Sequence, residues 1–279
     1  MTGRGPATDR QSSPAAAEGT PDRLPVSRHD VVPTPGLLLA SSLAQVALDV
    51  GGLLVLDGPS GTGKTTGAAW IARQHPEWTW AYLQVPSRVR GEEVPAHVQE
   101  AITGYPARGR VRDIQRESVR LLGERRIAFI ADEVQHAGPV GLQALRYLGD
   151  LTDMGPAGAA PIFYIGHGSL AAVSRVPELL DRLVGDATFG LLAGGELLGF
   201  VHTLHPRLAV TSDEIVMRLD DQCAGNGSLR SWHTIVELLV RLGRHEPPTR
   251  PVTTTEVGQI AMFRKNIASI RRPLPGRDT

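Results

Sequence analysis

The feature that most constrains this chain is an apolar run that leads directly into a glycine-rich segment. The run is Leu53–Asp57, and the segment after it reads Gly58, Pro59, Ser60, Gly61, Thr62, Gly63, Lys64, Thr65 and Thr66. Because glycine has no side chain, consecutive backbone N–H groups in such a segment can turn inward and meet phosphate oxygens. A helix that begins near Gly63 adds its positive end at the same place. The pattern predicts a strand, a phosphate-binding loop and a helix, in that order.

Composition singles out the lysine of this segment. Of the 29 basic residues only Lys64 and Lys265 are lysines, and all the others are arginines. A compact ammonium suits the space between two phosphates, whereas a planar guanidinium does not fit the loop. We interpret Lys64 as a nucleotide ligand and Thr65 as a magnesium ligand. The alternative is a glycine-rich turn before an ordinary helix.

The overall charge and the cysteine content exclude several classes of protein. The 29 basic and 29 acidic residues balance, so any contact with nucleic acid must be local. Cys223 is the only cysteine, which excludes an internal disulfide. No apolar run reaches the roughly 18 to 20 residues that span a bilayer, and the N-terminus lacks a signal-peptide core. We expect a soluble, cytoplasmic protein with no membrane partner.

The chain divides into four segments by composition and periodicity. Residues 1–30 are predicted to be a disordered tail, because they contain hardly any large apolar side chain. Strands and helices alternate over residues 31–194, which predicts an α/β domain whose first helix is capped by Thr34 and whose last strand lies at about 187–192. Residues 195–250 are predicted to form a smaller helical domain, with helices at about 212–224 and 229–242. Residues 251–279 are predicted to be a helix, at about 254–263, and a basic tail.

An acidic pair is the second functional motif of the predicted α/β domain, after the glycine-rich segment. After Arg125 and Arg126, the apolar run 127–131 is typical of a buried parallel strand, and it ends in Asp132 and Glu133. Ligands of open α/β sheets collect at the carboxyl ends of the strands. We therefore assign Asp132 to magnesium, through water, and Glu133 to the base that orients and deprotonates an attacking water. A glutamate beside the magnesium aspartate favours hydrolysis over phosphorylation of a bound acceptor.

His167 follows another apolar strand, at about 161–166. At that position it either contacts the γ-phosphate or the attacking water, or it is a satisfied structural group. The sequence leaves both interpretations open.

Arginines are frequent between Pro86 and Arg126. Those in loops or at a helix start are Arg88, Arg90, Arg108, Arg110 and Arg112. One interpretation is a solvated surface with local ion pairs, and the other is a set of phosphate contacts to DNA. The basic C-terminal tail is a further candidate for DNA or protein contact.

Together these motifs resemble those of AAA+ ATPases over about residues 31–242, with GPSGTGKTT as Walker A and IAFIADE as Walker B. The stretches ADEVQH, ALRYLGDL, FYIGHGSL and PELLDRL are similar in order and spacing to the transposition helpers MuB, TnsC and TniB. The resemblance implies a P-loop NTPase fold, a three-layer α/β sandwich with a central parallel five-stranded sheet and a small helical lid domain. It implies ATP and Mg²⁺ as cofactors.

The resemblance also implies roles for three further residues. His167 occupies the sensor 1 position, where a smaller polar residue is more usual. Arg182 matches the arginine finger, which reaches the nucleotide of a neighbouring subunit; an ion pair with Asp181 or Glu178 is the alternative. Arg230, in the stretch Gly-Ser-Leu-Arg, matches the sensor 2 arginine that opens a lid helix.

The resemblance implies an ATP-hydrolysing protein that assembles on double-stranded DNA in the ATP state and activates a transposase. Its partners are then other copies of itself, DNA and the transposase. Two alternatives remain: a nucleotide switch that scaffolds protein partners in signalling or secretion, and a helicase loader. Fold alone does not separate them.

Overall fold

The strand β1 (Leu53–Asp57) lies inside a five-stranded sheet with the order β2-β3-β4-β1-β5. The structure is a computed structural model that describes residues 31–87, 89–90, 93–150, 159–224, 226–243, 247 and 249–270. The other strands are β2 (Thr79–Gln84), β3 (Ile127–Asp132), β4 (Ile162–Gly166) and β5 (Leu183–Thr188). All pairs of neighbours are parallel. The segments that follow β1, β3 and β4 therefore meet at one edge of the sheet.

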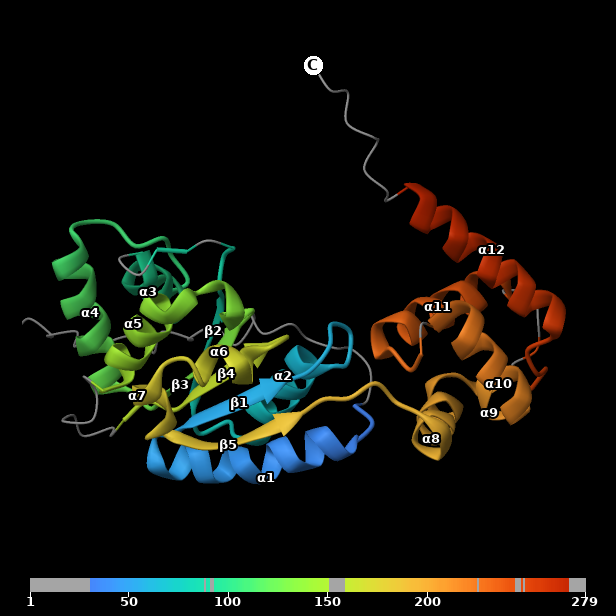
Figure 1. Ribbon diagram of the computed structural model, residues 1–279, viewed down its shortest axis with the longest axis horizontal. Helices are drawn as coiled ribbons and strands as arrows, with labels where there is room; N and C mark the ends of the chain where they lie inside the picture. Colours follow the sequence, from blue (N-terminus) through green and yellow to red (C-terminus); the bar gives the residue numbers. More distant parts are fainter. Residues whose placement is uncertain are drawn as a thin grey trace, which may run out of the picture.

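Helices cover both faces of this sheet (Figure 1). Leu54 and Leu56 point to the face covered by α1 (Pro35–Val50) and α2 (Lys64–Gln74). Leu53 and Val55 point to the opposite face. That face is covered by α3 (Val94–Thr103), α4 (Val111–Glu124), η2 (Val134–His136), α5 (Gly138–Asp150), α6 (Ser169–Val173) and α7 (Pro177–Leu180). Burial on both faces explains why β1 and β3 are continuous apolar runs, and each fully buried leucine contributes about 1.5 to 3 kcal/mol.

The first helix begins and ends as its sequence predicts. The Thr34 hydroxyl accepts a hydrogen bond from the Leu37 amide at 3.3 Å, and Pro35 takes the first helical position. Gly51 ends the helix in the left-handed conformation, with φ of 65°. Helix α1 thereby runs along the edge strand β5 and β1 and shields them from water.

The chain continues beyond β5 as helices alone, with a hydrophobic core of their own. These are α8 (Gly194–Leu204), α9 (Pro206–Ala209), α10 (Asp213–Leu219), the π-helical turn η3 (Asp220–Ala224), α11 (Leu229–Leu242) and α12 (Thr254–Ile270). We call them the helical region. Its core surrounds Trp232, which is fully buried and donates from Nε1 to the buried Asp220 carboxylate at 2.8 Å. Figure 1 shows this region beside the sheet, at the end where α2 begins.

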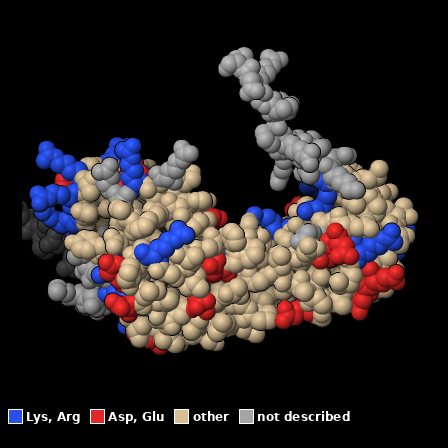
Figure 2. Space-filling view, in the orientation of Figure 1, with Lys and Arg blue, Asp and Glu red and all other residues tan. Residues whose placement is uncertain are grey.

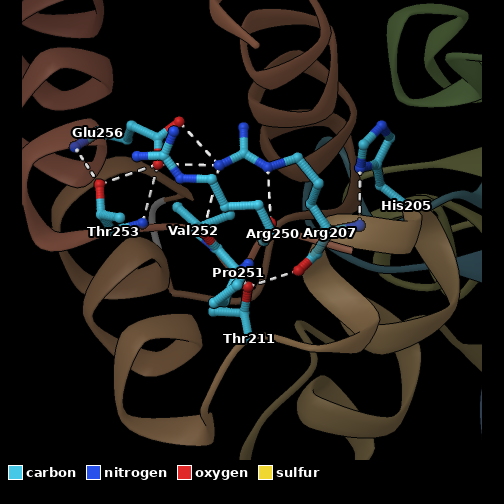
Figure 3. A network of polar contacts seen from close by, with 8 residues as sticks. All are labelled: His205, Arg207, Thr211, Arg250, Pro251, Val252, Thr253 and Glu256. Carbon is cyan, nitrogen blue, oxygen red and sulfur yellow. Dashed lines mark hydrogen bonds and ion pairs between the residues drawn. The ribbon is translucent and has the colours of Figure 1, made fainter. Parts of the chain in front are cut away.

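A buried ion pair ties the two ends of the helical region together (Figure 3). Arg207, on α9, is 2% exposed and contacts the Glu256 carboxylate of α12 at 2.8 Å. Its guanidinium also donates to the backbone oxygens of Arg250 and Pro251. Burial by itself raises the pKa of Glu256, but hydrogen bonds from Thr253 and Arg207 outweigh it and hold that pKa below its ordinary value. The charges inside this cluster are therefore matched within the protein.

The structure confirms the predicted α/β fold with a parallel five-stranded sheet, and it corrects several boundaries. The last strand is Leu183–Thr188 and not 187–192. As an edge strand paired only with β1, it is partly solvent-exposed and tolerates Gly185 and Asp186, which interrupt the expected apolar run. Helices α8 and α9 had not been predicted. The short helix α7 ends at Leu180, and α12 extends beyond the expected 263.

Some predictions fall outside the described residues. The predicted N-terminal tail at 1–30 lies there, and so do Arg88 and residues 271–279, the last part of the predicted C-terminal helix and basic tail. Within the described part of the chain, no helix combines the length and the apolar character that a membrane crossing requires.

Candidate nucleotide-binding site

The glycine-rich segment forms a tight loop between β1 and α2. Gly58 has a φ of 145° and Gly61 a φ of 84°, conformations that side chains disfavour. A Cβ atom on Gly58 would lie 2.1 Å from the Phe189 carbonyl oxygen, and one on Gly61 would lie 2.8 Å from the Ser228 hydroxyl. The segments that contain Phe189 and Ser228 therefore pack too closely against these two glycines to leave room for a side chain. Helix α2 begins at Lys64, so its first N–H groups face the inside of the loop.

Lys64 places its ammonium inside this loop. Its side chain is largely buried, and Nζ donates to the carbonyl oxygens of Gly58 and Pro59 at 2.6 and 2.7 Å. Burial lowers the pKa of Lys64, while the charges of Asp132 and Glu133 oppose that shift. Since its hydrogen-bond partners among the described residues are neutral carbonyl oxygens, the ammonium retains a positive charge that can attract an anion.

Asp132 joins the loop to the central strand β3. Its Oδ2 accepts hydrogen bonds from the Thr65 hydroxyl at 2.7 Å and from the Tyr82 hydroxyl at 3.0 Å. Its Oδ1 accepts from the Glu133 amide at 2.9 Å. The predicted partners Thr65 and Asp132 thus lie together, and their hydroxyl and carboxylate oxygens are ligands that fit Mg²⁺.

Tyr82 belongs to this site, although the sequence did not point to it. It lies on β2 opposite Ile130, two residues before the Gln84–Asp132 pair, and therefore on the same face of the sheet as that pair. Burial and the neighbouring Asp132 charge raise the pKa of Tyr82 far above its ordinary value. The phenol therefore stays protonated and acts as a neutral donor to Asp132.

Glu133 follows Asp132 at the same edge of the sheet. Its backbone has φ of 60° and ψ of 36°, a left-handed conformation that is uncommon outside glycine. The side chain is 47% exposed, and its Oε2 accepts a hydrogen bond from Gln135 Nε2. His136 Nε2 lies 3.9 Å from the same oxygen. The acidic pair is therefore divided, with Asp132 buried against the loop and Glu133 half-exposed beside it.

Asp57, at the end of β1, is fully engaged by backbone amides. Its Oδ1 accepts from Gly58 and Gly168 at 2.6 and 2.8 Å, and its Oδ2 accepts from Leu170 at 3.1 Å. This carboxylate ties the segment after β4 to the phosphate loop. His167 lies in that segment, is exposed, and has no hydrogen-bond partner among the described residues.

Arg230 comes to the loop from the helical region. Its backbone amide donates to the Gly61 carbonyl oxygen and its Nη1 to the Ser60 hydroxyl, both at 3.1 Å. Ser228 caps helix α11 just before it. Residues about 170 positions apart in the sequence thus meet at one site.

Arg182 lies at the amino ends of the strands, opposite the carboxyl ends where the phosphate loop lies. Its carbonyl oxygen accepts from the Leu53 amide at 2.8 Å, at the amino ends of β1 and β5. Because the strands are parallel, this edge is separated from the loop by the length of β1. Arg182 therefore does not contribute to the site of its own chain.

The candidate DNA-binding arginines occupy an exposed surface. Arg108 and Arg110 lie just before α4 and Arg112 lies in its first turn, and none of them has an ion-pair partner among the described residues. Arg120, farther along α4, instead pairs with Glu117 and Glu124 at 2.7 and 2.5 Å. Arg90 is exposed, and its backbone amide donates to Glu93. Figure 2 shows basic side chains gathered over the end of the molecule where α3 and α4 lie.

The geometry defines a P-loop nucleotide-binding domain, and comparisons with known proteins place it more closely. Residues 48–173 match a family model described as an AAA domain. The Aeropyrum pernix Orc1 protein, in a structure with DNA, is similar in fold: the TM-score is 0.62 at 19% identity, over 91% of this chain and 71% of that one. PCH-2 of C. elegans gives a TM-score of 0.47 at 16% identity, over 84% of this chain and 68% of that one. A search of curated proteins gives no match. Residues 48–173 are thus similar to an AAA domain, and the likeness to the Orc1 protein shows that the α/β P-loop fold is shared.

Proposed function

We propose that this protein binds ATP with Mg²⁺, hydrolyses it, and uses the nucleotide cycle to assemble on DNA as a helper of transposition. The observation that carries the hydrolytic part is the contact between Thr65 and Asp132, with Glu133 next to them. It brings a phosphate loop, an oxygen-rich cation site and a carboxylate base to one edge of the sheet.

The chain offers a residue for each task of that reaction. The loop amides from Gly58 to Thr66 and the Lys64 ammonium bind the phosphates, and Arg230 closes over them from the helical region acting as a lid. Thr65, and Asp132 through water, would hold Mg²⁺, and the bound ion would neutralise phosphate charge. Glu133 takes a proton from the attacking water. His167 senses the γ-phosphate.

Position favours a shared site between subunits. Arg182 lies at the amino ends of the strands, away from the loop of its own chain, so any nucleotide it contacts would belong to another copy. We infer that Arg182 completes the site of an adjacent copy and stabilises charge on the γ-phosphate. The Arg182→Ala variant should lose hydrolysis and regain it when mixed with Lys64→Ala subunits, which still carry the arginine. Absence of rescue would argue against sharing.

DNA binding is supported by the arginines at the start of α4. They are exposed and lack carboxylate partners among the described residues, which favours phosphate contacts over local ion pairs. The fold is also that of a protein whose structure was determined with DNA. The transposition role rests on the similarity of motif order to the MuB, TnsC and TniB proteins. A nucleotide switch that scaffolds proteins, or a helicase loader, is the second candidate.

One experiment separates these candidates. ATP hydrolysis and duplex DNA binding are measured together over a range of salt concentrations. A DNA-assembling ATPase shows stimulated hydrolysis, and binding weakens with a log–log slope of about −0.9 per phosphate neutralised. Replacing Arg108, Arg110 and Arg112 by alanine should reduce that slope, whereas Arg120→Ala is the matched control because Arg120 is already paired. No binding of duplex DNA at low salt with ATP would exclude the DNA role.

A further inference from the structure

Gln135 is the side chain that holds the Glu133 carboxylate. It lies in the short turn η2, two residues after Glu133, and its Nε2 donates to Glu133 Oε2. The other end of the amide, Oε1, is buried and has no hydrogen-bond partner among the described residues. The Nε2 end of the Gln135 amide therefore bonds to Glu133, whereas the Oε1 end has no hydrogen-bond partner among the described residues.

The end of strand β4 is shaped around this amide. A Cβ atom on Gly166 would lie only 2.0 Å from Gln135 Oε1 and 3.1 Å from its Cδ. The backbone of Gly166 is not in the left-handed region, so its conformation does not require glycine. The missing side chain instead provides the space that Gln135 occupies.

Packing alone does not explain a glutamine at this position. A buried acceptor without a partner loses its hydration with no compensation, and a methionine of similar length would fill the space without that cost. Reversing the amide would bring Oε1 against the carboxylate, two acceptors in contact. The hydrogen bond from Nε2 to Glu133 thus explains why position 135 is a glutamine.

The contact leaves one oxygen of Glu133 available. Both neighbours, Gln135 Nε2 and the more distant His136 Nε2, face Oε2. Among the described residues, no side chain bonds to Oε1. A half-exposed glutamate has several free torsions, so a tether on one oxygen fixes the direction in which the other accepts a proton.

We propose that Gln135 is a positioning residue that fixes the Glu133 carboxylate so that its Oε1 faces the attacking water. The inference rests on the proposed role of Glu133 as the base in ATP hydrolysis. Gln135 acts through Glu133 alone and does not contact the nucleotide.

The first test uses Gln135→Met, which keeps the length of the side chain and removes the donor. The turnover number for ATP should fall at least about tenfold, as part of the 10²–10⁴-fold contribution of a general base. The KM for ATP and the affinity for a non-hydrolysable ATP analogue should stay unchanged. In a Glu133→Gln background the same change should have no further effect. Gln143→Met is the matched control, because Gln143 donates to an exposed carboxylate, Glu178, away from the site.

A second variant disturbs the contact without altering Gln135. Gly166→Ala would push the flexible end of Gln135 aside, and we expect the same loss of turnover with nucleotide affinity retained. Gly199→Ala, on α8, meets no neighbouring atom and serves as its control. Thermal unfolding of each variant checks that it is folded.

Each outcome decides between the two proposals. Normal turnover in Gln135→Met and Gly166→Ala would overturn the positioning role, and so would an equal loss in the Glu133→Gln background. A wild-type protein that hydrolyses no ATP, or a Glu133→Gln variant that hydrolyses it normally, would instead overturn the proposed function itself.

Discussion

Two buried polar clusters of this protein hold their charges in opposite ways. In the helical region, the Arg207 guanidinium meets the Glu256 carboxylate, so positive and negative charge are matched inside the protein (Figure 3). In the phosphate loop, Lys64 donates to carbonyl oxygens and Asp132 accepts from hydroxyls and an amide. These partners are neutral.

The difference separates structural charge from functional charge. A matched pair has little attraction left for a ligand, and its removal leaves an uncompensated buried partner. A charge held by neutral groups is positioned but not cancelled, so it can still bind an ion of opposite sign. Lys64 and Asp132 are therefore suited to phosphate and to a cation, whereas Arg207 and Glu256 are suited to stability.

The largest expected effect is the loss of the matched pair. Glu256→Ala should lower the free energy of unfolding by about 3 to 5 kcal/mol, because the buried Arg207 would lose its counter-charge. Chemical denaturation measures this change. Glu237→Ala is the control, since its contact with His233 is exposed and should contribute less than about 1 kcal/mol. A similar small loss in both variants would contradict the matched-charge interpretation.

The corresponding change in the loop should affect binding and spare stability. Lys64→Met should weaken ATP binding about 100-fold, since a charged hydrogen bond contributes about 1.5 to 3 kcal/mol. The free energy of unfolding should change by less than about 1 kcal/mol, because no carboxylate loses a partner. Calorimetric titration and denaturation of the same sample test both parts. A stability loss as large as that of Glu256→Ala would show that Lys64 is a structural charge.

A smaller effect is expected for the neutral donor Tyr82. Tyr82→Phe removes one of the hydroxyls that hold Asp132, and groups that orient a metal ligand typically contribute about 10- to 100-fold in affinity. The loss should appear in ATP affinity with Mg²⁺ and vanish without it. Tyr105→Phe, at an exposed residue, is the control. An equal loss with and without Mg²⁺ would assign Tyr82 to packing.

Local patterns explain which parts of this molecule the sequence predicts. The loop after β1 and the strand before Asp132 are contiguous motifs, and α11 is marked by the Ser228 cap and by Gly243. Strand β5 was misplaced because an edge strand does not require an apolar run. Helix α8 was missed because it opens with Gly194 and Gly195, which usually interrupt helices.

The rest of the site depends on contacts between distant segments. Tyr82 and Asp132 are 50 positions apart, and only the register of β2 on β3 brings them together. Gln135 can occupy its position only because Gly166, at the end of another strand, has no side chain. The Arg207 pair likewise joins residues 49 positions apart. No periodicity within one element signals such contacts.

The smallest effect concerns an exposed contact of the helical region that depends on pH. His202 Nε2 lies 2.9 Å from the Asp213 carboxylate and Nδ1 lies 2.7 Å from the Leu208 carbonyl oxygen. Both partners are acceptors, so only the protonated ring can donate to both, and these bonds raise the pKa of His202 above its ordinary 6.5. A raised folded-state pKa contributes stability that is fully present below the unfolded value and is lost as pH rises through the folded value. The stability difference between the wild type and His202→Gln should therefore shrink as pH rises from below 6.5 through that range, and Asp213→Asn should reproduce the trend. If the stability difference between the wild type and His202→Gln stays constant with pH, His202 contributes through packing and not through a charge.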